Sequence, residues 1–280
     1  MFNFGSKTSP NTQMQGPVGG PVGDPLSSAI GMRDKDAINL VREALRKKRV
    51  RLAFQPVVQS TKPDRRAFFE GLIRVLDPNG RVIPAKDFID SVEDKEMGRK
   101  LDALALEKGL EALQSEPGLR LSINMSARSI GYPGWKKVLE RGLEDDPHLG
   151  ERLILEITER TAITMPELVR VFMAEMQGHG ISFALDDFGA GYTSFKYLKD
   201  FYFDIIKIDG EFIRGIHSDP DNQILTQAMV SVARHFDMFT VAESVETAED
   251  AAFLTQIGVD CMQGYYFGVP TLDPYWRKAA

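Results

Sequence analysis

The sequence has little of several features that mark common classes of protein. Cys261 is the only cysteine among 280 residues, so no disulfide can form within the chain and nothing indicates an oxidising compartment. No apolar run approaches the roughly 18 residues that a membrane helix needs, and the N-terminus lacks the apolar core of a signal peptide. We therefore expect a soluble, cytoplasmic protein without a membrane span.

The sequence also lacks an excess of positive charge and lacks histidines at the spacing of metal ligands. The net charge is -6 at pH 7 and the pI is about 5.4, which argues against non-specific binding to the backbone of a nucleic acid polymer. The four histidines, His148, His179, His217 and His235, show no metal-ligand spacing. A substrate that carries phosphate must therefore be attracted by local cations rather than by the field of the whole protein.

The first 34 residues differ in composition from the rest of the chain. They are rich in glycine, proline and small polar residues and have no periodic apolar pattern, which predicts a disordered leader or linker over 1–34. Ile38, Leu40, Val41 and Leu45 then recur at helical spacing. We expect one folded domain over 35–280, beginning with this helix.

Within the domain, short apolar runs alternate with longer helical segments. The runs cover 51–58, 66–75, 119–126, 152–159, 181–187, 203–209, 239–244 and 259–264. Helical patterns cover, among others, 99–114, 165–178, 220–236 and 247–257. This order predicts an α/β protein with a TIM-like (β/α)8 barrel. A doubly wound open sheet is the alternative, but no Gly-rich phosphate fingerprint follows an early strand. The connection between the first two runs is too short for a crossover helix, so we expect an antiparallel start.

A polar residue lies within or just after each of the second to eighth apolar runs. In order they are Glu70, Asn124, Glu156, the pair Asp186–Asp187, Lys207, Glu243 and Gln263. Taken alone, Glu70 with Arg74 could equally be the solvated face of an edge strand. Seven such positions are harder to explain in that way, because the carboxyl ends of barrel strands converge on one mouth where active sites are built.

The residue types indicate the chemistry of this mouth. Together with Glu246, the set holds six carboxylates and one lysine, and carboxylates held so close oppose one another's ionisation unless cations are bound. Ligands that are all oxygen suit Mg2+ or Mn2+. The pair Asp186–Asp187 suggests two ions, as in two-metal phosphoryl-transfer sites. Lys207 could orient the attacking water or neutralise developing charge. The residues thus predict metal-assisted hydrolysis of a phosphate ester.

Seven ordered motifs carry a family resemblance. "FFEGLIRV", "NMSAR", "LEITE", "DDFGAGYTSF", "IIKID", "VAESVET" and "MQGYYFGVP" together resemble the EAL domain family of cyclic di-GMP phosphodiesterases over residues 35–275. The resemblance implies a (β/α)8-type barrel with an antiparallel first strand. It also implies bacterial second-messenger signalling, in which cyclic di-GMP is opened to linear pGpG with two Mg2+ or Mn2+ ions. A homodimer is expected from the family, and a regulatory protein partner is possible.

Carried over position by position, the resemblance assigns roles to residues of this chain. One metal would be held by Glu70, Asn124, Glu156 and Asp186, and the second by Asp186, Asp187 and Glu243. Lys207 would contact the nucleophilic water, and Glu246 and Gln263 would position water or phosphate. Arg74, Gln55 and Asp209 match positions near the bound nucleotide.

The segment "DDFGAGYTSF" resembles the family's loop that couples metal binding to dimerisation. Gly189 and Gly191 would allow its tight backbone, and Glu159 matches the glutamate that steadies it. The alternative for Glu159 is an ordinary acid at a helix N-terminus next to Thr158.

The chain departs from the family pattern at four positions. Gly71 replaces the alanine of the signature, so that it reads E-G-L, while Ala190, Ser244 and Val75 replace the usual threonine, glycine and tryptophan. None of the four removes a metal ligand. The alternative to an enzyme is a catalytically weak or inactive receptor or scaffold for cyclic di-GMP, and the complete ligand set favours the enzyme.

Overall fold

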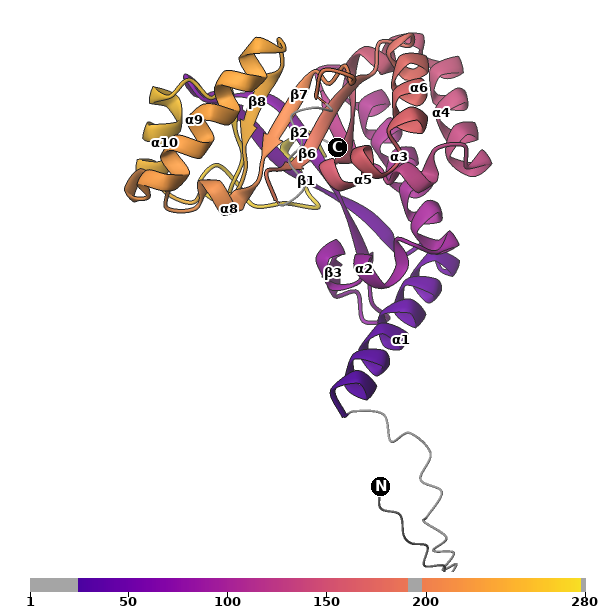
Figure 1. Cartoon of the computed structure of the whole chain (residues 1–280). Helices are drawn as coiled ribbons and strands as arrows, with labels where there is room; N and C mark the ends of the chain where they lie inside the picture. Colours follow the sequence, from indigo (N-terminus) through magenta and orange to yellow (C-terminus); the bar gives the residue numbers. More distant parts are fainter. Residues whose placement is uncertain (1–24, 191–197, 278–280) are drawn as a thin grey trace, which may run out of the picture.

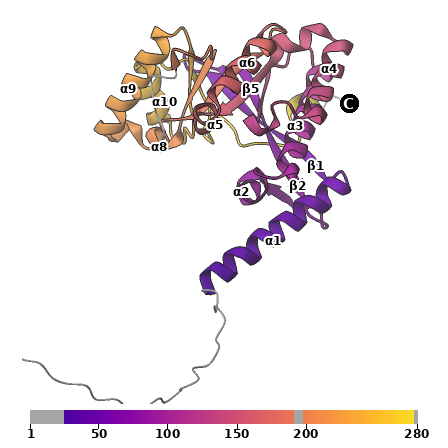
Figure 2. The ribbon, with the colours of Figure 1, turned by 45° about the vertical axis from the view of Figure 1, so that its right-hand side comes forward.

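The chain forms a barrel with a helical extension at its N-terminal end (Figures 1 and 2). The computed structural model describes residues 25–190 and 198–277, so most of the predicted leader lies outside it. Helix α1 (Pro25–Arg46) starts inside the segment predicted to be disordered, because Pro25 is compatible with a first helical turn. Among the described residues, no helix combines the length and the apolar composition that crossing a membrane requires.

The first two strands confirm the predicted antiparallel start. Strands β1 (Val50–Gln59) and β2 (Lys62–Leu76) form a hairpin in which Gln55 lies opposite Glu70. A short third strand, β3 (Val82–Pro84), pairs antiparallel with the end of β2 and was not predicted. Its three residues are too few to show a period.

The remaining strands close a barrel. They are β4 (Leu121–Asn124), β5 (Leu153–Thr158), β6 (Ser182–Phe188), β7 (Ile205–Ile208), β8 (Phe239–Ala242) and β9 (Cys261–Met262). Strand β2 is parallel to β4 and the parallel pairing continues to β9. Strand β1 closes the ring because it pairs antiparallel with both β2 and β9. The predicted TIM-like barrel is therefore confirmed, with β3 as an addition at its rim.

Helices cover the outside of the barrel (Figure 1). They are α3 (Glu96–Ser115), α4 (Pro133–Asp145), α5 (Glu159–Thr164), α6 (Pro166–Gln177), α8 (Gly210–Ile213), α9 (Pro220–His235) and α10 (Ala248–Gln256). The short helix α2 (Ile89–Val92) instead lies in the extension beside β3 and α1. Proline stands in the first turn of α4, α6 and α9, where its missing N–H costs nothing. The four helical patterns named from the sequence correspond to α3, α6, α9 and α10.

The barrel interior is layered. An apolar layer of Val57, Phe68, Ile154, Ala184, Ile205 and Val241 packs between the strands. Side chains of a strand return to the same face every second residue, so the next layer toward the mouth is formed by the residues two positions later. Within or directly after five strands these are Glu70, Glu156, Asp186, Lys207 and Glu243. The strand period therefore places the polar set directly above a dry core.

A separate apolar cluster supports the extension. Val41, Val50, Val75, Phe88 and Leu101 are buried together where α1 and α2 meet the ends of β1 and β2. The main core lies between the barrel and its outer helices. The mouth of the barrel faces the space between these two cores, since residues of both line it.

Candidate active site

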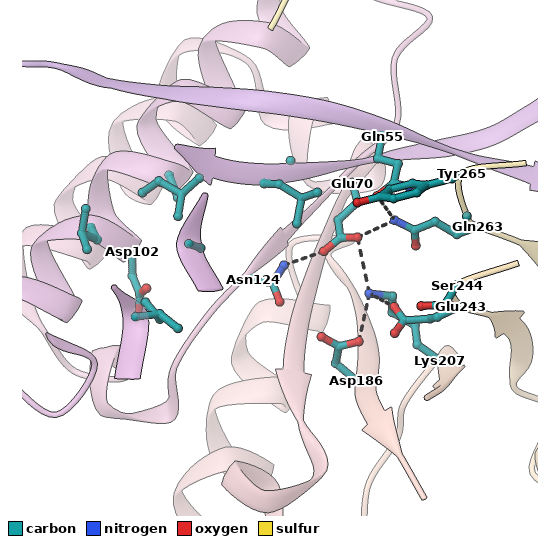
Figure 3. Close-up of a pocket in the computed structure, with 18 of the residues that line it drawn as sticks. Gln55, Glu70, Asp102, Asn124, Asp186, Lys207, Glu243, Ser244, Gln263 and Tyr265 are labelled. Carbon is teal, nitrogen blue, oxygen red and sulfur yellow. Dashed lines mark hydrogen bonds and ion pairs between the residues drawn. The ribbon is translucent and has the colours of Figure 1, made fainter. Parts of the chain in front are cut away.

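A cavity of about 510 Å3 opens at the carboxyl ends of the strands. Its polar lining contains most of the residues singled out from the sequence: Gln55, Glu70, Asn124, Asp186, Lys207, Glu243, Glu246 and Gln263. Except for Glu246, which Figure 3 does not label, the figure shows these side chains pointing toward one another from β1, β2 and the ends of successive strands. The predicted convergence is thus confirmed for residues that are far apart in the sequence.

Lys207 lies at the centre of the cluster. Its Nζ is 2.7 Å from Glu243, 2.8 Å from Glu156, 2.9 Å from Asp186 and 3.7 Å from Glu70, measured to carboxylate oxygens. The side chain is only 1% exposed. Burial alone would lower the pKa of this ammonium group, but the four carboxylates outweigh burial and raise it well above its ordinary value. Lys207 therefore stays charged and neutralises part of the acidic cluster.

Glu70 is fixed from both sides. Asn124 Nδ2 donates to its Oε1 at 2.7 Å, and Gln263 Nε2 donates to its Oε2 at 2.6 Å. Burial raises the pKa of Glu70, but Lys207 and these two donors together bring it below its ordinary value. Gln263 Nε2 also donates to Gln55 Oε1 at 3.2 Å, which ties β1 to the cluster. The ionised Glu70 is consequently held in one orientation.

Asp186, Asp187 and Glu243 can share a cation. One ligand oxygen from each lies within 4.8 Å of the other two. In a regular strand two consecutive residues point to opposite faces, but the pairing of β6 with β7 shifts register after Leu185 and Asp187 has a φ of 56°. Such a bulge re-aims side chains. It explains how neighbouring aspartates contribute to the same cluster.

The electrostatics of the cluster fit divalent cations. Burial, reinforced by Asp186 and Glu70, raises the pKa of Glu243 to about 8 against the opposing effect of Lys207. Burial and the neighbouring Asp186 raise the pKa of Asp187 to about 6. Glu156 Oε1 is buried without a hydrogen-bond donor among the described residues. Carboxylates that resist ionisation and an unpaired buried oxygen are what a bound hard cation would stabilise.

Four predicted residues lie at the margin of this arrangement. Arg74 does not line the cavity; its Nη1 donates to Ile73 O at 2.9 Å, although it lies in the field of Glu70. Asp209 Oδ1 accepts from Glu211 N at 2.6 Å and so caps α8. Asp187 and Glu159 line a neighbouring cavity of about 430 Å3.

Glu159 fits both interpretations made from the sequence. It lies in the first turn of α5, whose N-cap is Thr158, and its Oε2 accepts from Gly189 N at 3.2 Å. Gly189 has a φ of 101°, and a Cβ atom there would lie 2.5 Å from Phe212 Cε2, so glycine is required at this position. The rest of the motif, including Gly191, falls within 191–197, so its predicted coupling to dimerisation lies outside the described residues.

The sequence interpretation missed three residues that line the cavity: Asp102 of α3, Arg214 and Tyr265. Ser244 also lines it, and the sequence had singled it out only as a departure from the family pattern. Tyr265 belongs to a quoted motif and directly follows Gln263–Gly264, and Arg214 follows the strand that carries Lys207, so their positions offered a signal. Asp102 offered only a charged residue in the middle of an otherwise apolar helical turn.

Similarity to known proteins agrees with this geometry. The model of the family described as EAL domain matches residues 38–270. The probable cyclic di-GMP phosphodiesterase PdeN of Escherichia coli K12 is 33% identical over 245 residues, covering 84% of this chain and 46% of PdeN. The chain thus spans less than half the length of this curated relative.

Solved structures share the fold. The structure of the PaMucR phosphodiesterase in complex with c-di-GMP superimposes with a TM-score of 0.74 at 28% identity, covering 84% of this chain and 97% of that one. The EAL domain of FimX from Pseudomonas aeruginosa, bound to c-di-GMP, gives 0.77 at 25% identity and covers 85% and 97%. With nearly the whole described domain matched, this chain belongs to the EAL domain family.

Proposed function

We propose that the protein hydrolyses cyclic di-GMP to linear pGpG with the help of divalent cations. The observation that carries the proposal is the cluster around Lys207, in which four carboxylates, three from strands and Glu243 directly after β8, lie within 4.0 Å of one ammonium group at the barrel mouth. The names of PdeN and PaMucR identify the same reaction or ligand in relatives of this domain. Cleavage of one phosphodiester of the ring by water leaves a 5′-phosphate and a free 3′-hydroxyl.

Two groups of ligands are proposed for two Mg2+ or Mn2+ ions. The first comprises Glu70, Asn124, Glu156 and Asp186, and the second comprises Asp186, Asp187 and Glu243. When bound, such ions supply Lewis-acid activation of the phosphate and of a water molecule. Their fit rests on the raised pKa values of Glu243 and Asp187 and on the all-oxygen ligand set.

Residues of the chain itself would orient the attacking water and the substrate. Lys207 carries N–H donors at the level of the carboxylate layer and would hold the attacking water by one of them. Gln263 already donates to Glu70 and would keep that carboxylate aimed into the cavity while substrate binds. Glu246 and Tyr265 lie at the more exposed end of the lining, where the nucleotide would enter. Gln55 would contact the nucleotide from the antiparallel strand.

Arg74 and Asp209 receive weaker roles near the nucleotide. Both already make hydrogen bonds within the protein, so each would act on the substrate mainly through its charge. Glu159 would hold the loop after β6 through Gly189. A homodimer and a regulatory protein partner are further parts of the proposal that follow from the family resemblance alone.

The function is tested by following the conversion of cyclic di-GMP to pGpG chromatographically, with Mg2+ or Mn2+ and with a chelator. We expect metal-dependent turnover, and loss of at least about 100-fold in kcat for Glu70→Gln because a neutral amide binds a hard cation more weakly than the carboxylate that it replaces. The matched control is Glu111→Gln on the exposed face of α3, which should keep the wild-type rate. Binding of cyclic di-GMP without turnover in either metal would instead establish the receptor alternative.

A further inference from the structure

The active-site cavity has a second cation that its acidic cluster does not use. Among the described residues that line the cavity, Lys207 and Arg214 are the cations. Lys207 is buried and surrounded by four carboxylates. Arg214 is exposed, and it follows α8 on the loop beyond β7. Arg214 is therefore the lining cation whose charge is available to a ligand.

The backbone around Arg214 is fixed on both sides. On its N-terminal side, Asp209 caps α8, and Arg214 N donates to Gly210 O at 3.1 Å. On its C-terminal side, the buried Asp250 accepts from Gly215 N at 3.4 Å and from His217 N at 3.1 Å. Gly215 adopts a left-handed conformation with a φ of 70°, which turns the chain directly after the arginine. The guanidinium thus extends from a rigid base.

Ser244 holds the other end of this side chain. Its Oγ accepts from Arg214 Nη2 at 3.1 Å. Ser244 has a φ of 56°, a left-handed conformation that a glycine would adopt at lower cost. It directly follows Glu243, and Figure 3 shows the two side chains together at the rim of the acidic cluster. The strained serine thus supplies an acceptor that the glycine usual at this position could not supply.

Gly210 makes room for this contact. A Cβ atom at position 210 would lie 2.6 Å from Ser244 Cβ and 3.0 Å from Arg214 Nη2. Any side chain at position 210 would therefore push the serine and the guanidinium apart. Gly210, Arg214 and Ser244 form a matched set, which we call the arginine clamp.

We propose that the arginine clamp binds the second phosphodiester of a cyclic dinucleotide, the one that is not cleaved. This inference rests on the proposed function. Cyclic di-GMP carries two phosphodiesters, and the acidic cluster can accept one of them only together with cations. The other needs a positive group of its own in a cavity whose remaining lining charge is negative. A guanidinium presents several N–H donors in a planar fork, so Arg214 can donate to Ser244 and to phosphate oxygens together.

The test compares two diesters with the purified full chain. Cyclic di-GMP has a second phosphodiester, whereas bis(p-nitrophenyl) phosphate has none. We expect Arg214→Gln to raise KM for cyclic di-GMP at least tenfold, with a smaller change in kcat. The loss of kcat/KM that it causes for bis(p-nitrophenyl) phosphate should be at least fivefold smaller than the loss for cyclic di-GMP. Arg214→Lys keeps the charge but loses the fork, and should fall between wild type and Arg214→Gln. The control is Arg141→Gln, an exposed arginine of α4 that lines a different cavity.

Ser244→Gly tests the clamp itself. We expect a smaller rise in KM, about threefold, and the double variant with Arg214→Gln should be no worse than Arg214→Gln alone because both changes remove the same interaction. Equal losses on both diesters, or an unchanged KM, would overturn the inference. If wild type does not hydrolyse cyclic di-GMP, the proposed function fails by itself. Calorimetric titration with cyclic di-GMP then decides the clamp, which requires weaker binding by Arg214→Gln than by wild type.

Discussion

The Cδ1 methyl of Ile123 occupies the space into which a side chain at position 71 would project. A Cβ atom on Gly71 would lie 2.6 Å from this methyl, and one on Gly109 of α3 would lie 3.0 Å from it. Ile123 on β4 thus fills a gap between β2 and α3 that the two glycines leave open. Glycine at the altered position of the E-G-L element therefore fits the space that Ile123 leaves, and Glu70 remains held by Asn124 and Gln263.

The exchange between these two positions can be measured. Gly71→Ala should destabilise the protein by about 1 kcal/mol, since a methyl group is forced against Ile123 Cδ1 in a packed core. Ile123→Val removes that methyl and alone should cost roughly 0.5–1.5 kcal/mol. The free energy of unfolding of the double variant should lie within about 0.5 kcal/mol of the wild-type value, because the methyl group added at position 71 occupies the space that Ile123→Val vacates. Urea unfolding in a chelator measures all three, and strictly additive losses would contradict this packing.

Lys207 is predicted to be essential for stability as well as for catalysis. Lys207→Met leaves four carboxylates, three of them buried, without their common counter-ion, and removing one partner of a buried ion network typically costs roughly 3–5 kcal/mol. The loss should be partly restored by Mn2+, which supplies positive charge to the same oxygens. Thermal unfolding with and without Mn2+ measures both effects.

A surface lysine provides the comparison for this variant. Lys100 forms an exposed ion pair with Glu96 at 2.9 Å, and Lys100→Met should change stability by less than about 1 kcal/mol. It should also show no restoration by Mn2+. A Lys207→Met protein as stable as wild type in the chelator would mean that the carboxylates do not depend on the ammonium group.

Much of the fold and of the site could be predicted from the sequence because both depend on strand periodicity. Residues such as Phe68 and Glu70, or Ile205 and Lys207, are two positions apart, so an apolar layer and a polar layer follow from the same pattern. The short link between β1 and β2 likewise excluded a crossover helix. These inferences needed only local spacing and the rule that strand ends converge.

What could not be predicted depends on conformations that leave no pattern. The pairing of Asp186 with Asp187 was predicted, but the bulge with a positive φ that brings Asp187 to the cluster was not. The capping of a four-residue helix by Asp209 was not predicted either. Arg214 and Ser244 meet across two loops that are 30 residues apart. The early start of helix α1 at Pro25 was not predicted, because the glycines and prolines of the N-terminal segment obscured the helical period there. Tertiary contacts of this kind are decided by loop geometry rather than by the order of residue types.

Metal affinity should rise with pH. The pKa values of Glu243, about 8, and of Asp187, about 6, are raised in the metal-free protein by burial and by neighbouring carboxylates. Both groups must lose their protons before they can bind a cation. We expect the affinity for Mn2+ to increase between pH 6 and 8 by about tenfold per pH unit where one proton is displaced. Calorimetry in two buffers with different ionisation heats counts the protons released.

Glu243→Gln separates the two groups in this experiment. The variant should release fewer protons above pH 7, and its affinity for Mn2+ should depend less on pH. An unchanged number of released protons would show that another group holds the proton that we assign to Glu243.

Asp102 should make a pH-dependent contribution to stability. Its Oδ2 accepts from Ser126 N at 3.1 Å and from Ser129 Oγ at 2.6 Å, which fixes the turn that follows Asn124. Burial nevertheless raises the pKa of Asp102 to about 6, since these two donors only partly oppose it. A carboxyl group that binds its proton more tightly in the folded state stabilises the protein at low pH. That contribution is complete below about pH 4 and is lost as the pH rises through 6.

Asp102→Asn isolates this contribution, because an amide oxygen can accept from the same two donors but does not titrate. The stability of wild type relative to Asp102→Asn should therefore fall by roughly 1–3 kcal/mol between pH 4 and pH 7 and then stay constant. Urea unfolding in a chelator at four pH values measures the difference, with Asp64→Asn on the exposed part of β2 as the baseline. A difference that grows as the pH rises would show that Asp102 is stabilised as the carboxylate, and that Ser126 and Ser129 outweigh its burial.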